Sequence, residues 1–460
     1  MKDHTLMSLS IQKEIKKQRL VIESEVNSSL NELNMRTLLY RSNIRKEKGY
    51  SPVSLLFVML LLPLSKINLT SLWTSDFYDR FVNAGKDAYY RFLNHPRFNW
   101  RKFIYLVVNR VLAYCDDTVF NEKVLIADDT LLNKTGKNME LVGYHHDHKT
   151  HRSQLGYQML QLGYHNGTHF FPLDVGFHTS KKRPNEKISS VDRRTNGWRR
   201  RAETFKKKTD LLVEMLQRAY RQGIDARFVL FDSWFAHDKI ISKILDIGYG
   251  VICRLKAGKT LYRYKGELLT LKKIWHNIAR HQLQKIPQWN IKAAAVNLEL
   301  PLCGTVCVVF VRWSKKRWHC FLCTETDLEI VKILDYYARR WTIEVYFRDC
   351  KQLLELGKGQ SETFDALIAW TSIVMLRYLL LVYILSKRYS TGPIGPLFQC
   401  LAQEQLELTV IPVLWTRLRQ IMMMSSQLFS SDSDTETFLY ILDMVENMLL
   451  DNSVLFTAKL

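Results

Sequence analysis

Residues 336–351 read YYARRWTIEVYFRDCK, and this stretch governs the interpretation of the whole chain. A helical repeat would place five of its side chains on one face, because they recur at steps of three or four residues: Tyr337, Arg340, Glu344, Arg348 and Lys351. A lone acid among cations and a phenol suits a metal-bound phosphodiester, since the acid can hold the metal while the cations hold phosphate oxygens. The alternative is a solvated charged face, the usual setting of such residues.

The composition favours a globular protein with an anionic partner. Of its 460 residues, 47% are hydrophobic and 24% are charged, which excludes a disordered chain. The formal net charge of +21 predicts a large anionic partner. Nucleic acid is the leading candidate, and an anionic membrane surface is the alternative.

Two apolar runs bear on whether the chain spans a membrane. Residues 53–64 are too few to cross a bilayer and include Pro63. Residues 366–386 are long enough, but Arg377 and several hydroxyl side chains favour a buried core helix. The N-terminus lacks the apolar segment of a signal peptide. We therefore expect a cytoplasmic protein, nucleoid-associated when bound to DNA, with no membrane partner.

The ends of the chain are predicted to be helical and the centre to be α/β. Apolar residues recur at helical spacing over Ser10–Val26 and Lys86–Tyr114, where basic and aromatic side chains also alternate as in a helical DNA-binding unit. A plain helical bundle is the alternative for these segments. The pattern predicts five regions: a helical DNA-binding region (1–118), the first part of an α/β core (119–256), a β-rich insertion (257–326), the second part of the core with the Glu344 helix (327–390), and a helical C-terminal region (391–460).

Strands and helices alternate in the central region, and two of the strands end in an acid. Lys123–Asp128 and Arg227–Asp232 are short apolar runs typical of buried strands. The pattern also predicts strands over Gln154–His165, Thr168–His178 and Gly248–Leu255, and helices over Arg199–Gln222 and Ala236–Ile247.

Asp128, Asp232 and Glu344 are the candidate metal ligands and catalytic acids. Ligands of open α/β sheets gather at the carboxyl ends of strands, so the two aspartates converge if their strands are neighbours, and Glu344 can complete the group. Three carboxylates repel one another unless divalent cations neutralise them. Oxygen ligands favour Mg²⁺ or Mn²⁺, and two such ions can clamp a phosphate. For either aspartate alone, a turn residue or a helix N-cap is the alternative.

The chain resembles the DDE transposases of bacterial insertion sequences. The subgroup pattern Tyr-x2-Arg-x3-Glu-x6-Lys is complete in Tyr337, Arg340, Glu344 and Lys351. The first and second acidic motifs of these enzymes match residues 128–130 (DDT) and 231–235 (FDSWF). The resemblance covers residues from about 120 to 390 and implies an RNase H-like α/β core with a β-rich insertion. It also implies that Glu344 binds metal and that Tyr337, Arg340 and Lys351 hold the DNA end.

The first acidic motif leaves two candidates, because Asp129 directly follows Asp128. Alternation along a strand would point the two side chains in opposite directions. The Asp-x-Thr register of the family motif favours Asp128.

Further cations and aromatic residues are candidates for DNA contact. Thr179–Lys208 holds twelve Lys or Arg and three Asp or Glu residues, an excess of nine positive charges, which predicts salt-dependent DNA binding. A solvated loop is the alternative. Other candidates are the base-stacking residue Trp234 and the cations Lys134, Lys137 and Arg348; Trp198 could stack in the same way, and either tryptophan could instead be buried.

Two clusters contain residue types that bind metals. Cys303, Cys307, Cys320 and Cys323 could bind zinc, but Thr305–Trp313 and Trp318–Thr324 are predicted to be paired strands. Alternation then directs Cys320 and Cys323 to opposite faces, which disfavours a zinc site. The histidine-rich run 144–151 is assigned to a loop that contacts DNA or solvent rather than a dedicated metal.

The predicted function is DNA transposition. The enzyme would hydrolyse a phosphodiester at each element end, and the freed 3′-hydroxyl would attack target DNA at the same acidic site. The expected partners are double-stranded DNA, comprising terminal inverted repeats and target, and a second copy of the chain, since two ends must be brought together. The alternatives are a nuclease without joining activity, a decayed transposase that only binds DNA and, weakest, a basic structural protein.

Overall fold

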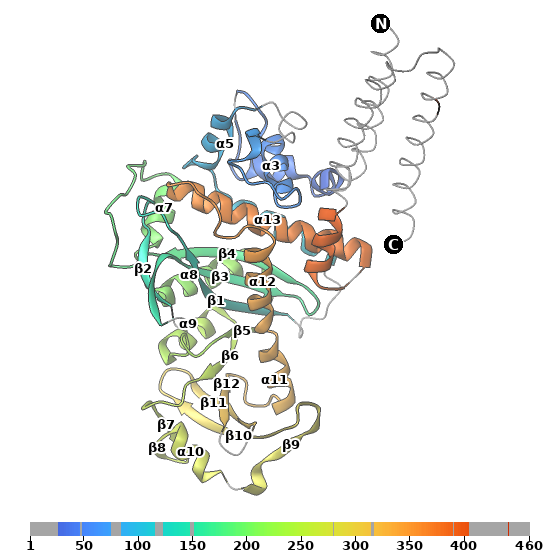
Figure 1. The fold of residues 1–460 in the computed structure, drawn as a ribbon. Coiled ribbons are helices and arrows are strands. Elements are labelled where there is room, and N and C mark those ends of the chain that lie inside the picture. The colour runs from blue at the N-terminus through green and yellow to red at the C-terminus, as the bar shows by residue number, and fades with distance from the viewer. Residues whose placement is uncertain are drawn as a thin grey trace, which may run out of the picture. The chain divides into compact units, whose positions relative to one another are not determined.

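The computed structural model describes residues 26–46, 48–74, 84–115, 123–147, 151–278, 280–313, 317–389, 391–403 and 440 (Figure 1). Contacts divide the chain into two units, one of Asn27–Phe398 and the other of Met1–Val26 with Gln399–Leu460. The account below concerns the first unit. The helix predicted over Ser10–Val26 lies, apart from its last residue, outside the described residues.

Five strands at the centre of one mixed sheet form the core. Their spatial order is β4-β3-β1-β5-β6, with β3 antiparallel to β1 and β4, and β5 parallel to β1 and β6. The α/β class and RNase H-like core expected from the sequence are confirmed. The strands are β1 (Val124–Asn133), β3 (Arg152–His165), β4 (Phe170–His178), β5 (Phe228–Phe231) and β6 (Gly250–Leu255).

The first core strand is longer than the sequence indicated. Lys123–Asp128 was expected to end at the acid, but β1 continues five residues further, to Asn133. The reason is its pairing: β5 accompanies β1 only as far as Ile126, whereas β3 pairs with it down to Asn133 opposite Gly156. Asp128 and Asp129 therefore lie within a strand, beyond the point where the parallel neighbour ends.

The β-rich segment predicted at 257–326 extends the same sheet. Its last strand pairs antiparallel with β6, and the others follow outward in the order β12-β11-β10-β7-β8, with β9 beside β10. The predicted pairing of the two cysteine-bearing strands is confirmed. These strands are β7 (Leu261–Tyr264), β8 (Glu267–Thr270), β9 (Gln284–Ile286), β10 (Ile291–Leu300), β11 (Gly304–Arg312) and β12 (Trp318–Cys323).

Two further predictions need correction. The histidine run was assigned to a loop, but Gly143–Asp147 is strand β2, which pairs along the first residues of β3; residues 148–150 lie outside the described part of the chain. The single helix predicted over Arg199–Gln222 is two helices, α7 (Asn196–Glu203) and α8 (Lys208–Arg221). The hydroxyl of Thr204 donates to the Arg201 carbonyl at the end of α7.

Helices pack around the core sheet, and one of them is buried between the other helices and β4. Alpha-helix α13 (Phe364–Tyr389) contacts α3, α5, α6, α7 and β4. By length and composition it could cross a bilayer, but its whole apolar window is buried in the structure, which confirms the predicted core helix. The remaining elements are α2 (Met35–Arg41), α3 (Pro52–Leu61), η1 (Leu72–Thr74), α5 (Lys86–Leu93), α6 (Trp100–Cys115), α9 (Asp238–Ile247), α10 (Leu271–Asn277), η3 (Arg280–Gln282), η4 (Pro287–Trp289), α11 (Ile330–Ala338) and α12 (Trp341–Gln352).

Arg377, a charged residue within the apolar helix α13, has buried hydrogen-bond acceptors. Arg377 is 4% exposed and donates to the carbonyls of Leu354 and Met59 at 2.7 and 2.6 Å. Because Met59 lies in α3 and Leu354 follows α12, this one guanidinium ties the N-terminal helices to the segment that carries Glu344.

Candidate active site

Asp128 lies on β1, and Asp232 directly follows the neighbouring parallel strand β5 at a corresponding position. The last residue pair of the β1–β5 ladder is Ile126 with Leu230, so two further residues along each strand bring Asp128 and Asp232 opposite each other. The pKa of Asp128 is raised to about 7, chiefly by burial and also by the nearby carboxylates of Asp129 and Asp232, while Arg340 opposes the increase. A half-buried acid with a strongly raised pKa beside another acid is a candidate functional group.

Glu344 joins this pair through a guanidinium. Arg340 donates from Nη1 to Asp128 Oδ2 at 3.2 Å and from Nη2 to Glu344 Oε1 at 2.5 Å. Helix α12 packs against β1, which brings its first turn to the strand. The structure thus brings the three predicted acids into one site, with the predicted DNA-binding Arg340 between two of them.

The segment 336–351 is not a single helix, which corrects the expectation that five side chains share one helical face. It breaks at Arg339 and Arg340, where backbone bonds span three residues instead of four, and Thr342 Oγ1 donates to the Arg339 carbonyl at 2.8 Å. Tyr337 therefore lies on α11, with its ring 4.7 Å from that of Phe321. Arg340 remains close to it, 5.8 Å above the ring.

The other predicted DNA-binding cations have different surroundings. Lys351 donates to Thr130 Oγ1 at 2.7 Å and to the Leu131 carbonyl at 3.2 Å, so it is held against the first acidic motif. Lys134 donates to the carbonyls of Gly357 and Gly359 at 2.5 and 2.7 Å, and burial lowers its pKa to about 8. By contrast, Lys137 and Arg348 are exposed.

A cation that belongs to none of the sequence motifs, Lys208 of α8, lies against the other face of β1. Lys208 forms an ion pair with Asp129 and lies 4.0 Å from the ring centroid of Trp234. The Trp234 amide donates to Asp232 Oδ1 at 2.9 Å. Asp129, Lys208 and Trp234 therefore form a chain of contacts that ends on the second acid. Lys208 was noted only as part of the basic segment, because no motif spacing connects it with either aspartate.

A cavity of about 330 Å³ lies on this face of β1 and is lined by Asp129, His145, His146, Gln158, His178, Lys208, Asp232, Trp234 and Phe235. Trp234 is 46% exposed, so its ring is open to solvent on the side that Lys208 leaves free. Burial lowers the pKa of His145 to about 4 and also lowers that of His178, which keeps both imidazoles neutral at pH 7.

The acids fit divalent metal by their donor chemistry. Asp128, Asp232 and Glu344 offer only carboxylate oxygens, which suit hard ions. Within the described ranges, no three acidic, histidine or cysteine side chains are close enough to form a ready ligand set. Arg340 occupies the space between Asp128 and Glu344, so it has to shift before those carboxylates can share an ion. Burial raises the pKa of the candidate zinc cysteines, to about 11 for Cys307 and to about 12 for Cys303, Cys320 and Cys323.

Two protein families match the part of the chain that carries this site. The model described as "DDE superfamily endonuclease" matches residues 76–284, which include Asp128 and Asp232. The model described as "Archaeal putative transposase ISC1217" matches residues 186–394, which include Asp232 and Glu344. A search of curated proteins gives no match. The RNase H-like fold and both family matches support a transposase-type nuclease. Both matches support a DDE transposase, and enzymes of the DDE superfamily use divalent metal ions and act on DNA.

Proposed function

We propose that this protein is the transposase of an insertion sequence, which cleaves the element ends and joins them to target DNA. The observation that carries the proposal is the contact of Arg340 with both Asp128 and Glu344, with Asp232 beside Asp128, within an RNase H-like core. Membership of the narrower subgroup with the Tyr-x2-Arg-x3-Glu-x6-Lys pattern is part of the proposal and rests on Tyr337, Arg340, Glu344 and Lys351.

Asp128, Asp232 and Glu344 are the proposed ligands of Mg²⁺ or Mn²⁺, with two ions at the site. When bound, such ions supply charge neutralisation and Lewis-acid activation of the attacking oxygen. We assign the first ligand to Asp128 rather than Asp129, because Asp128 shares Arg340 with Glu344 whereas Asp129 forms an ion pair with Lys208 on the opposite face.

Arg340 has a second proposed role as a phosphate contact. Its Nε is buried and, among the described residues, has no hydrogen-bond partner, so the guanidinium has a spare donor. Guanidinium groups bind phosphate oxygens in a fixed fork geometry. Release of Arg340 from the carboxylates would therefore free a phosphate ligand at the reacting centre.

The remaining predicted DNA contacts are Tyr337, Arg348, Lys351, Lys134, Lys137 and Trp234. The solvent-exposed Arg348, Lys137 and Trp234 suit direct contact with DNA. Lys134 and Lys351 are held by backbone and hydroxyl oxygens, so their contact with DNA would be made from a fixed position.

The proposed assembly is a homodimer on double-stranded DNA, with terminal inverted repeats and target as substrates. We retain the five proposed regions: a helical DNA-binding region (1–118), the two parts of the core (119–256 and 327–390), the insertion (257–326) and a helical C-terminal region (391–460). The proposed location is the cytoplasm, at the nucleoid when bound to DNA.

The test is Mg²⁺-dependent cleavage and strand transfer on duplex DNA that carries the element's own ends. We expect Asp128→Asn, Asp232→Asn and Glu344→Gln to abolish both reactions, and Asp129→Asn to retain cleavage. Cleavage without strand-transfer products would identify a nuclease that does not join DNA. Salt-sensitive binding with no cleavage by the wild type would identify a DNA-binding remnant.

A further inference from the structure

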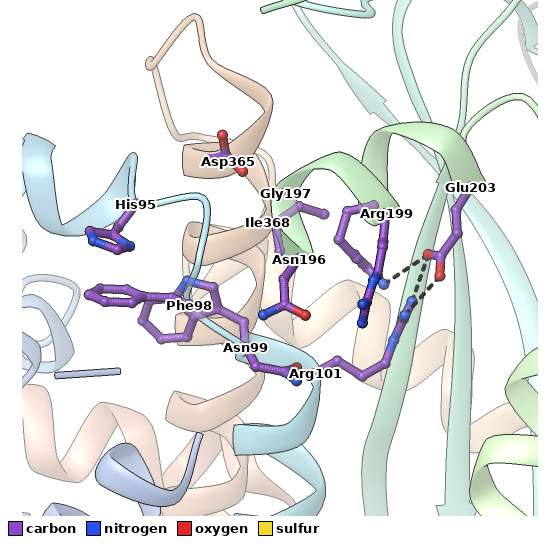
Figure 2. A pocket seen from close by; sticks show the side chains of 12 residues that line it. His95, Phe98, Asn99, Arg101, Asn196, Gly197, Arg199, Glu203, Asp365 and Ile368 are labelled. Carbon is purple, nitrogen blue, oxygen red and sulfur yellow. Dashed lines mark hydrogen bonds and ion pairs between the residues drawn. The ribbon is translucent and has the colours of Figure 1, made fainter. Parts of the chain in front are cut away.

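A second cavity lies where the N-terminal helical segment meets the core. Its volume is about 180 Å³, and Figure 2 shows it between the turn that begins at His95 and the start of α7. The polar groups about it include Asn99, Arg101, Asn196 and Arg199. None of its lining residues belongs to the catalytic group or to the cavity beside Trp234.

Backbone contacts fix the two walls of this cavity. The Gly197 amide donates to the Pro96 carbonyl at 2.8 Å, and Asn196 Nδ2 donates to the Arg97 carbonyl at 2.9 Å. Gly197 has no room for a side chain, because an added Cβ would lie 2.3 Å from Asp365 Oδ1. The first turn of α7 and the turn at Pro96 are therefore held together as one rigid surface.

The buried cations behind this surface are already matched by acids. Arg101 pairs with Asp174 and Glu203, both at 2.8 Å, and Arg200 pairs with Glu203 at 3.2 Å. Arg201 pairs with Glu140 at 2.7 Å and Asp365 at 2.8 Å. These pairs leave no excess charge inside.

The exposed cations at the rim are different. Arg97 and Arg199 are solvent-exposed, and neither forms an ion pair with any carboxylate in the described part of the chain. Trp198, between Thr195 and Arg199, is 38% exposed. The N-terminus of α7 adds the positive end of a helix dipole at the same place. The rim therefore carries two exposed arginines that make no salt bridge with a described carboxylate, and Arg97 interacts with Asp192 only at longer range.

We propose that Arg97 and Arg199, with the first turn of α7 and Trp198, form a docking surface for the phosphate backbone of duplex DNA. We call these residues the junction surface. We choose duplex DNA as the occupant because a polyanion complements these positive charges, to which the exposed Arg193, two residues before Thr195, adds another. The proposal rests on the proposed function, since it assumes that DNA is the substrate, and it adds a binding surface separate from the acids.

The test measures duplex DNA binding by fluorescence anisotropy over a range of KCl concentrations, with the full-length protein. The double variant Arg97→Gln/Arg199→Gln should lower the slope of log K against log salt by about two, because each phosphate contact contributes about one. The loss should be equal for duplexes of unrelated sequence. The matched control is Arg110→Gln/Arg221→Gln, which removes the same charge from exposed positions outside the junction surface and should keep the wild-type slope.

Unfolding midpoints should be unchanged in both variants, because the four side chains are exposed. The junction-surface proposal would be overturned by a wild-type salt slope in the Arg97→Gln/Arg199→Gln protein, or by an equal loss of slope in the control. If cleavage persists in either case, the proposed transposase function still stands. Conversely, a reduced slope in a protein that does not cleave DNA would support the junction surface and count against the proposed function. Absence of DNA binding by the wild type at low salt would overturn the choice of DNA as the occupant.

Discussion

The Arg340 guanidinium bridges to Asp128 at 3.2 Å, within the carboxylate group of the candidate active site. This contact holds a half-buried acid whose pKa is raised to about 7, chiefly by the part of it that is shielded from water. In the folded protein Arg340 therefore stabilises the charged carboxylate of Asp128, whereas burial destabilises it.

The raised pKa of Asp128 predicts a pH-dependent stability. The folded state binds this proton more tightly than the unfolded chain, so the contribution favours folding below about pH 4 and is lost as the pH rises through about 7. As the pH rises through this range, the wild type should lose up to roughly 4 kcal/mol of unfolding free energy, because one pKa unit corresponds to about 1.4 kcal/mol. The Asp128→Asn variant should not show this loss. Urea denaturation of both proteins in metal-free buffer between pH 4.5 and 8 measures the difference. Parallel pH curves for the two proteins would contradict the prediction.

Lys208 is expected to position the second acid. Lys208→Met removes the partner of Asp129 and the cation on Trp234, whose amide holds Asp232. We expect cleavage to fall by about tenfold, or roughly 1.4 kcal/mol in the barrier, and the tryptophan fluorescence to shift. Lys208→Arg preserves the charge and should restore most of the activity. If the Met and Arg variants cleave equally well, the contact chain has no influence on Asp232.

Arg201 should be among the most sensitive buried positions. It is 3% exposed and pairs with Glu140 and Asp365, so Arg201→Met leaves two buried carboxylates without their cation. The expected loss of unfolding free energy is about 3–5 kcal/mol. The control is Arg199→Gln on the same helix, which is exposed and should change stability by less than about 0.5 kcal/mol. Chemical denaturation of both variants is the measurement, and similar losses would refute the assignment.

Substitution of Lys134 should affect the stability of the fold, whereas substitution of Lys137 should affect DNA binding. The Lys134 ammonium is held by two backbone carbonyls, so Lys134→Met should destabilise the fold by about 1–3 kcal/mol by leaving those carbonyls unsatisfied. Lys137 is exposed, so Lys137→Gln should weaken DNA binding without changing the unfolding midpoint. Thermal unfolding and salt-dependent anisotropy of the two variants test both halves. Unchanged stability in Lys134→Met would show that its carbonyl contacts are unimportant.

The core could be predicted from the sequence because its strands are short apolar runs closed by turn residues. Asp232 follows β5 as expected, and Glu344 lies on a helix packed against β1. The length of β1 could not be predicted, because it depends on which neighbour continues beside it and not on its own residues.

The interruption between α11 and α12 and the role of Lys208 were also beyond sequence reasoning. Helical spacing continues across Arg339 and Arg340, so periodicity alone cannot show the tightened turn there. Lys208 lies 79 residues from Asp129, and the contact exists only because α8 packs against β3 and β4. Side chains that meet through tertiary packing leave no local pattern.

The unbroken sheet has a mechanical consequence. Strand β12 of the insertion is paired with β6 at four positions, from Cys320 opposite Leu255 to Cys323 opposite Ile252, and β6 lies directly beside the strand that ends at Asp232. The insertion cannot rotate as a separate body without breaking the hydrogen bonds between β12 and β6. The sheet therefore fixes the position of the insertion relative to Asp232.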